Sequence, residues 1–176
     1  MKLIGSLLAT ALCLAHASAA WAADAPKKKN WTAPAEKIRA QALADEIMST
    51  HPELISVTFH GVPPGLDKVY TMFAGSFPER IGNPDDPDDI DVTKKGITIL
   101  DPRWHRTNDT DKKFVVLMPM RDRSGENVGL VVYAFKNPKN PSASATEKEY
   151  LAKSTVLRDE LAKKIPSYKA LFDPAK

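Results

Sequence analysis

The strongest constraint on the fold is a pair of apolar runs that flank one short polar segment. Residues 114–120 and 128–135 are almost continuously apolar, and the segment between them contains Ser124-Gly125, a pair typical of tight turns. Short runs rich in valine and phenylalanine, bounded by turn residues, favour strands. The pattern therefore predicts an antiparallel β-hairpin.

Two further strands are expected earlier in the chain. Ile55, Val57 and Phe59 alternate with polar residues, which is typical of a half-buried strand. Residues 61–65 then read as a turn, and residues 69–74 as a second strand.

Helices are expected at both ends of these strands. Residues 32–50 are rich in good helix formers, with Pro34 tolerated in the first turn and Pro52 marking the exit. The apolar face of this helix is formed by Ala40, Leu43, Ala44, Ile47 and Met48, and Ile38 lies off it. A second helix is predicted from the capping box Thr146–Glu149 as far as Pro166.

The predicted order of elements is helix, two strands, a long connection, a hairpin and a final helix. Antiparallel strands joined by hairpin-type connections, with helices packed beside them, indicate an α+β domain. The sequence therefore predicts one antiparallel sheet flanked by an N-terminal and a C-terminal helix.

The first residues resemble a secretory signal peptide. Lys2 precedes a short apolar run, and Ala20-Trp21-Ala22 fits an A-x-A cleavage site. The run is too short for a comfortable membrane span. We expect a signal peptide over residues 1–22, a flexible arm over residues 23–33 and a single domain over residues 34–170, and hence a periplasmic or secreted protein without stable membrane insertion.

Composition excludes several function classes. The net charge of +3 does not indicate a nucleic-acid binder, which usually shows a concentrated basic face. Cys13 is the only cysteine and lies in the predicted leader, so no disulfide, thiol nucleophile or cysteine-ligated metal is expected. The sequence has no P-loop, no G-x-G-x-x-G and no G-x-S-x-G motif. We therefore expect no enzymatic activity and no cofactor.

Metal binding is also not predicted. His51, His60 and His105 lack the i, i+4 spacing and the H-E-x-x-H motif of zinc enzymes. Five aspartates lie within residues 85–91, but Pro87 interrupts them and the EF-hand pattern is absent. Calcium binding stays an alternative for this run, and capping of a short helix after Pro84 or Pro87 is the preferred interpretation.

Two segments resemble one family. Residues 76–92, which contain Glu79-Arg80-Ile81-Gly82 and a run of aspartates, are similar to a stretch of bacterial periplasmic PDC/Cache sensor domains, which are PAS-like. Residues 116–129 resemble the P-x-x-D-x-x-G-x-x-I-G hairpin of the same superfamily, with valine in place of isoleucine. The resemblance covers roughly residues 35–135 and implies a stand-alone ligand-sensing fold without a transmitter of its own.

The resemblance also implies where a ligand would bind. Cache pockets lie between the sheet and the segment before the hairpin, where Arg103, Trp104 and His105 occur in this sequence. An arginine can grip a carboxylate in bidentate fashion, and an indole offers an apolar wall. The alternative is that Trp104 packs in the core beside solvated arginines.

Three strand residues complete the candidate site. Tyr70, Met72 and Tyr133 are predicted to line the pocket, and the alternative is that they fill the core. The expected partner is a small molecule, with a carboxylate as the candidate class, together with an envelope protein that receives the signal. The competing hypothesis is an envelope interaction or inhibitor protein that uses the fold as a scaffold.

Overall fold

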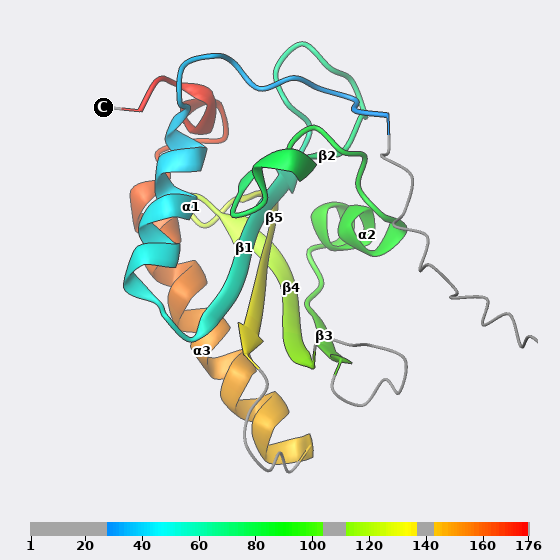
Figure 1. Cartoon of the computed structure of the whole chain (residues 1–176), viewed down its shortest axis with the longest axis vertical. Helices are drawn as coiled ribbons and strands as arrows, with labels where there is room; N and C mark the ends of the chain where they lie inside the picture. The colour runs from blue at the N-terminus through cyan, green and yellow to red at the C-terminus, as the bar shows by residue number, and fades with distance from the viewer. Residues whose placement is uncertain (1–27, 104–111, 137–142, 176) are drawn as a thin grey trace, which may run out of the picture.

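The computed structural model describes residues 28–103, 112–136 and 143–175, and it contains one sheet with helices on both faces (Figure 1). The helices are α1 (Arg39–Thr50), α2 (Pro87–Lys95) and α3 (Ala143–Lys164), with short 3-10 turns η1 (Pro78–Arg80) and η3 (Lys169–Phe172). The strands are β1 (Leu54–Gly61), β2 (Thr71–Gly75), β3 (Ile99–Pro102), β4 (Lys113–Arg121) and β5 (Asn127–Lys136).

The sheet is antiparallel throughout, with the strand order β2-β1-β5-β4-β3. The predicted α+β class is confirmed, and so is the central hairpin, in which β4 pairs with β5 from Lys113 opposite Lys136 to Arg121 opposite Asn127. The N-terminal helix α1 and the C-terminal helix α3 lie beside the sheet, as predicted.

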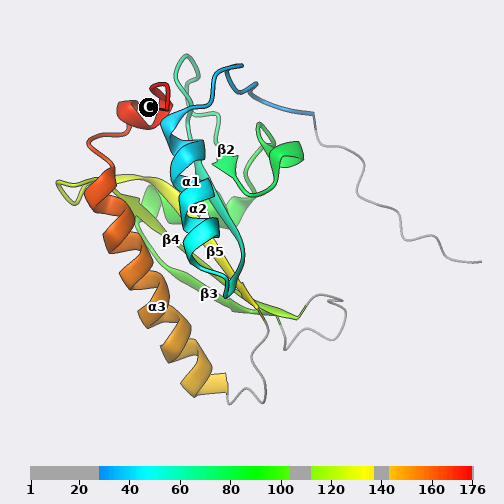
Figure 2. The ribbon, with the colours of Figure 1, turned by 60° about the vertical axis from the view of Figure 1, so that its left-hand side comes forward.

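The two faces of the sheet are covered differently. Helices α1 and α3 lie on one face and α2 lies on the other (Figures 1 and 2). The larger core forms under α1, α3 and η3, and its largest fully buried side chains include Phe59, Phe73, Phe114, Tyr133 and Phe135. A smaller core forms under α2 and consists of Val92, Val115, Leu117, Leu130 and Ala134.

The first helix begins later than predicted. Residues 32–38 are not helical, and Ile38 is extended with φ −82° and ψ 157°. Ile38 forms an isolated bridge with Pro174 and is buried, which explains why it lies off the helical stripe. The remainder of the stripe is confirmed, with Ala40, Leu43 and Ala44 buried.

The last helix begins earlier than predicted. It starts at Ala143, so Thr146 lies inside the helix and not at its N-terminal boundary. The predicted apolar face is confirmed, because Tyr150, Leu157, Leu161 and Ile165 all join the larger core.

Strand β1 is more deeply buried than its alternating sequence predicts. Val57 and Phe59 face the larger core as expected, but Ile55 is exposed and the polar residues Thr58 and His60 are buried. The cause is position, since β1 is an inner strand between β2 and β5 and α2 covers its second face.

The hairpin turn is held by one carboxylate. Asp122 Oδ1 accepts hydrogen bonds from Ser124 N at 2.9 Å, Ser124 Oγ at 2.6 Å and Glu126 N at 3.1 Å. These bonds favour the charged form and hold the pKa of Asp122 below its usual value. The aspartate of the P-x-x-D-x-x-G pattern therefore has a structural role here.

The segment expected as a flexible arm contacts the domain where it is described. Asn30 N donates to Gly82 O at 2.7 Å, and the Trp31 ring meets the Phe172 ring edge-on at 6.2 Å. The predicted leader over residues 1–22 lies outside the described residues, and no described helix is both long enough and apolar enough to cross a membrane.

Candidate ligand pocket and the neighbouring histidine–aspartate cluster

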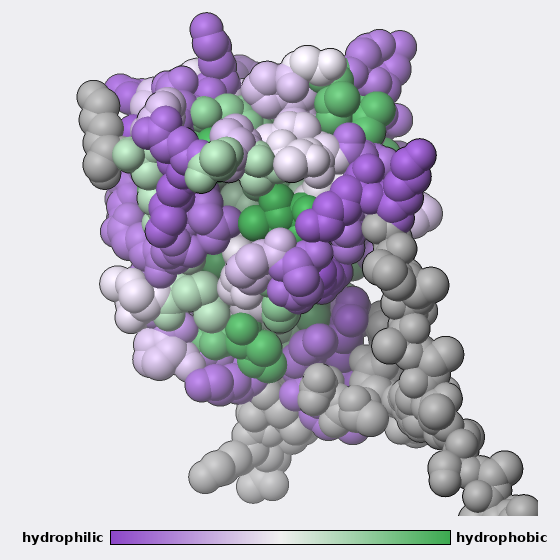
Figure 3. Space-filling model, turned by 45° about the horizontal axis from the view of Figure 1, so that its top comes forward, coloured by the Kyte–Doolittle hydropathy of each residue, from purple (hydrophilic) through white to green (hydrophobic). Residues whose placement is uncertain are grey.

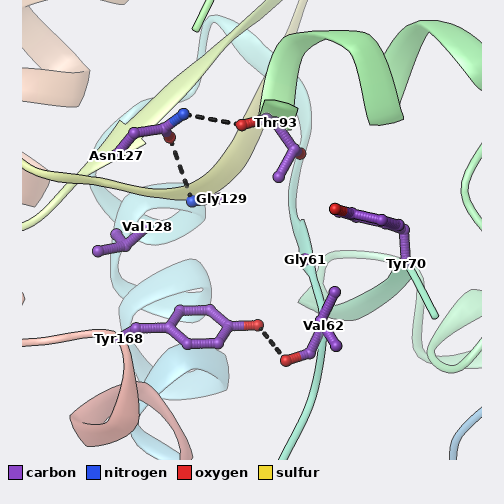
Figure 4. Close-up of a pocket in the computed structure, with 8 residues that line it drawn as sticks. All are labelled: Gly61, Val62, Tyr70, Thr93, Asn127, Val128, Gly129 and Tyr168. Carbon is purple, nitrogen blue, oxygen red and sulfur yellow. Dashed lines mark hydrogen bonds between the residues drawn. The ribbon is translucent and has the colours of Figure 1, made fainter. Parts of the chain in front are cut away.

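A pocket of about 280 Å³ lies where the end of β1 meets the start of β5 and the last turn of α2 (Figure 4). It is lined by Gly61, Val62, Tyr70, Thr93, Asn127, Val128, Gly129 and Tyr168. Its walls are mainly aliphatic and aromatic, with a few polar groups among them, which is the usual composition of small-molecule sites. Figure 3, in which the top of Figure 1 is tilted toward the viewer, shows small groups of hydrophobic side chains among hydrophilic ones.

Two side chains fix the shape of this pocket. Asn127 Nδ2 donates to Thr93 O at 2.8 Å and its Oδ1 accepts from Gly129 N at 3.3 Å, so it joins the end of α2 to the hairpin (Figure 4). The Tyr168 hydroxyl donates to Val62 O at 2.7 Å. Burial raises the pKa of Tyr168 well above its usual value, so this phenol stays protonated and keeps its hydrogen bond.

A cation lies beside the pocket wall. Lys94 Nζ is 5.2 Å from the centroid of the Tyr70 ring, in cation–π geometry. The Tyr70 hydroxyl points toward the side on which Thr93 and Tyr168 lie (Figure 4). The wall therefore combines an aromatic face with a positive charge at its edge.

The close approach of the Tyr168 side chain to the Gly61 backbone explains why the wall contains glycine at this position. A Cβ added to Gly61 would lie 2.8 Å from the Tyr168 hydroxyl, inside normal contact distance. A side chain at Gly61 would therefore require the Tyr168 hydroxyl to move.

A buried polar cluster lies directly behind this wall, on the α2 face of the sheet. His60 Nδ1 is 2.8 Å from Asp85 Oδ1 and 3.8 Å from Asp89 Oδ2, and His60 Nε2 is 2.7 Å from Thr58 Oγ1. Asp85 N donates to Tyr70 O at 3.1 Å, which connects the cluster to the pocket wall.

The aspartate run has the structural role that its sequence predicts. It caps α2, because Asp86 and Asp89 form a capping box in which Asp86 N donates to Asp89 Oδ2 at 3.2 Å. Burial raises the pKa of Asp89 and neighbouring Asp85 adds to this, while His60 opposes it.

Of the sequence-predicted site residues that the structure describes, Tyr70 alone lines the pocket. Met72 is buried on β2 and is not among the lining residues. Arg103 Nε donates to Asp101 Oδ2 at 2.8 Å, and Arg103 does not line the pocket. Trp104 and His105 lie outside the described residues.

Tyr133 is not among the residues that line the pocket. Its ring is fully buried in the larger core under α1 and α3, which corresponds to the core-filling alternative. Its hydroxyl is buried and has no hydrogen-bond partner among the described residues. Burial raises the pKa of Tyr133 far above its usual value, so the hydroxyl stays neutral.

We expect Tyr133→Phe to stabilise the protein, because a buried hydroxyl without a partner costs about 1–3 kcal/mol. The free energy of unfolding from urea denaturation should rise, and pocket occupancy should not change. Tyr150→Phe is the control, since the Tyr150 hydroxyl donates to Lys136 O at 3.3 Å and its removal should lower stability slightly. A loss of stability in Tyr133→Phe would show that its hydroxyl is bonded in solution.

The sequence provided little signal for the other pocket residues. Tyr168 follows Pro166, beyond the last predicted helix, and Asn127 is the first residue of β5. Only the glycine at position 129 carried a signal, as the final residue of the hairpin pattern.

Comparison with solved structures finds domains that are similar to this chain over most of its length at low sequence identity. The GAF domain of A. aeolicus Nlh2 in an inactive state is 10% identical with a TM-score of 0.48, covering 78% of this chain and 85% of that one. The phycocyanobilin-bound GAF domain of a cyanobacterial phytochrome is 18% identical with a TM-score of 0.45, covering 73% and 83%. The E. coli DcuS sensor domain is 16% identical with a TM-score of 0.37, covering 64% and 71%.

These likenesses concern the fold and carry no statement about ligand or activity. Neither the protein-family models nor the curated protein sequences give a match to this chain.

Proposed function

We propose that this protein is an exported, stand-alone small-molecule binding protein of the PAS/Cache type that passes its ligand state to an envelope partner and has no enzymatic activity. The observation that carries the proposal is the pocket of about 280 Å³ between β1, β5 and the end of α2. This volume is just below the usual range for ligand sites, so the ligand is small. Export rests on the signal-peptide pattern of residues 1–22.

The proposed ligand is a small carboxylate with an apolar body. Val62, Val128 and the tyrosine rings supply an apolar surface, and the exposed Lys94 supplies the positive charge beside it. This assignment replaces Arg103, whose guanidinium is paired with Asp101, as the group that would hold the carboxylate.

The test is calorimetric titration with a panel of small aliphatic and aromatic acids and their primary amides. Val128→Trp should abolish binding by filling the pocket, with an unchanged melting midpoint as the check on folding. Lys94→Gln should weaken binding of the acids up to about fivefold and leave binding of the amides unchanged, because an exposed ion pair contributes about 1 kcal/mol at most.

The matched control is Lys95→Gln, which makes the same charge change on the same helix. Lys95 Nζ is already paired with Asp91 at 2.8 Å, so this variant should bind the acids like wild type. The pocket assignment would be refuted if both variants lose the same affinity for the acids, or if wild type binds no member of the panel. Intact mass of periplasmic protein should lack about the first 22 residues.

A second candidate is the envelope interaction protein, in which the fold is a scaffold. It is favoured by two apolar side chains that α3 exposes to solvent, Val156 at 61% and Leu151 at 38%. This candidate would be selected if wild type captures a specific envelope protein that Val156→Asp does not capture, and if no acid or amide of the panel binds.

A further inference from the structure

Three side chains from separate parts of the chain converge on one point behind the pocket. His60 comes from β1, Asp85 from the loop before α2 and Asp89 from the first turn of α2. One ligand atom from each, the His60 nitrogen and a carboxylate oxygen from each aspartate, all lie within 4.8 Å of one another. His60 and Asp89 are largely buried, with side-chain exposures of 8% and 14%.

A second observation shows that this cluster is incomplete as it stands. The Asp85 side chain is 0% exposed, and its Oδ2 has no hydrogen-bond partner among the described residues. A buried carboxylate oxygen without a partner is costly, because it has lost its water and gained nothing in return. The cluster also places two carboxylates beside one imidazole, which leaves excess negative charge even when His60 is protonated.

The spacing of the ligand atoms fits a metal ion. Two ligands bonded at about 2.1 Å with a tetrahedral angle between them lie about 3.4 Å apart. The two distances from His60 Nδ1, 2.8 Å to Asp85 Oδ1 and 3.8 Å to Asp89 Oδ2, lie on either side of that value. The aspartate oxygens lie within 4.8 Å of each other, so rotation of the two carboxylates toward His60 Nδ1 would place all three atoms in one coordination sphere.

The second ring nitrogen of His60 makes the kind of hydrogen bond that is usual for a metal-binding histidine. When Nδ1 binds a metal, Nε2 carries the proton and needs an acceptor, and Thr58 Oγ1 lies 2.7 Å from it inside the buried sheet face. This contact fixes the imidazole ring in the orientation that points Nδ1 at the aspartates.

We propose that His60, Asp85 and Asp89 bind one divalent transition-metal ion of the Zn²⁺ type. One imidazole nitrogen with two carboxylate oxygens suits Zn²⁺, whereas Ca²⁺ and Mg²⁺ prefer all-oxygen sites. Neutral His60 and the two ionised aspartates would supply a charge of −2, which the ion balances. The site is distinct from the pocket and does not depend on the proposed function.

This site was not predicted from the sequence, because the spacing rules that excluded zinc apply to ligands on one helix. Here the histidine and the aspartates are 25 and 29 positions apart and meet only through the packing of α2 on β1. The capping role of Asp89 is compatible with the site, since a carboxylate oxygen has two lone pairs and Oδ2 can accept the hydrogen bond from Asp86 N while it binds an ion.

The experiment is titration of the purified full chain with ZnCl₂, followed by calorimetry and by ¹⁵N-edited NMR of the histidine rings. We expect one ion per chain and a shift of the His60 Nδ1 resonance to the metal-bound range, with Nε2 protonated and His51 unchanged as internal reference. Asp85→Asn and Asp89→Asn should each weaken Zn²⁺ binding by about 100-fold or more. Loss of a residue that only hydrogen-bonds to a metal ligand already weakens binding by about 10–100-fold.

Asp91→Asn is the matched control, because it removes the same charge from the same helix but its carboxylate pairs with Lys95 at the surface. It should bind Zn²⁺ like wild type, and millimolar Ca²⁺ should leave the melting midpoint in place. The proposal is overturned if wild type binds no Zn²⁺, if the His60 resonances stay unchanged on addition of Zn²⁺, or if Asp91→Asn loses as much affinity as Asp85→Asn. Preferential binding of Ca²⁺ would overturn the assignment of the ion type.

Discussion

Replacing Leu161 with alanine should lower the free energy of unfolding by about 2–5 kcal/mol, the usual cost of deleting a buried leucine side chain. Leu161 is 3% exposed and packs in the larger core together with Leu157 and Ile165 of the same C-terminal region. Helix α3 is the long element that covers this part of the sheet. The neighbouring side chains therefore have few ways to move into the cavity that the substitution leaves. Equilibrium denaturation in urea measures the effect.

The control for this prediction is Val156→Ala on the same helix. Val156 is 61% exposed, so its truncation should change stability by no more than about 0.5 kcal/mol. Equal effects at the two positions, or an unchanged urea midpoint in Leu161→Ala, would show that α3 does not dock on the sheet as described.

The elements that the sequence predicts well are those whose signal is local. The hairpin and the apolar face of α3 arise from periodicity within one segment, and the cap of α2 arises from Asp86 and Asp89 three residues apart. Each is formed by interactions between near neighbours, so a single stretch of sequence contains the information.

The errors have non-local causes. Residues 32–38 have helical composition, yet Ile38 is extended because it bridges Pro174 at the other end of the chain. The alternation in β1 indicates a half-buried strand, but the packing of α2 on the second face buries Thr58 and His60. Neither partner is visible from the segment itself.

The candidate site was predictable only in small part, for the same reason. The pocket is built from the end of β1, Tyr70, α2, the hairpin and Tyr168, five places along the chain that have no common motif. Tyr70 is a candidate because it falls within the strand predicted over residues 69–74, whereas Arg103 is a candidate by its position in the sequence and is paired with Asp101. Function in this fold depends on which side chains the topology brings to the end of the sheet, and composition does not contain that information.

We expect Gly129→Ala to destabilise the protein by on the order of 3 kcal/mol, since two separate penalties coincide there. Gly129 has φ +136°, a conformation that residues with a side chain rarely adopt. An added Cβ would also collide with the His60 carbonyl oxygen on the neighbouring strand. Backbone atoms of two paired inner strands cannot move apart without loss of the hydrogen bonds between β1 and β5.

Gly125→Ala separates these two penalties. Gly125 also has positive φ, at +88°, but nothing lies within 4 Å of its would-be Cβ. This variant should therefore carry only the conformational cost of about 1–2 kcal/mol. Urea denaturation of both variants measures the difference, and equal costs would mean that β1 and β5 do not approach as closely as described. The last glycine of the hairpin pattern is then explained by contact with the backbone of His60, whose side chain forms the proposed metal site.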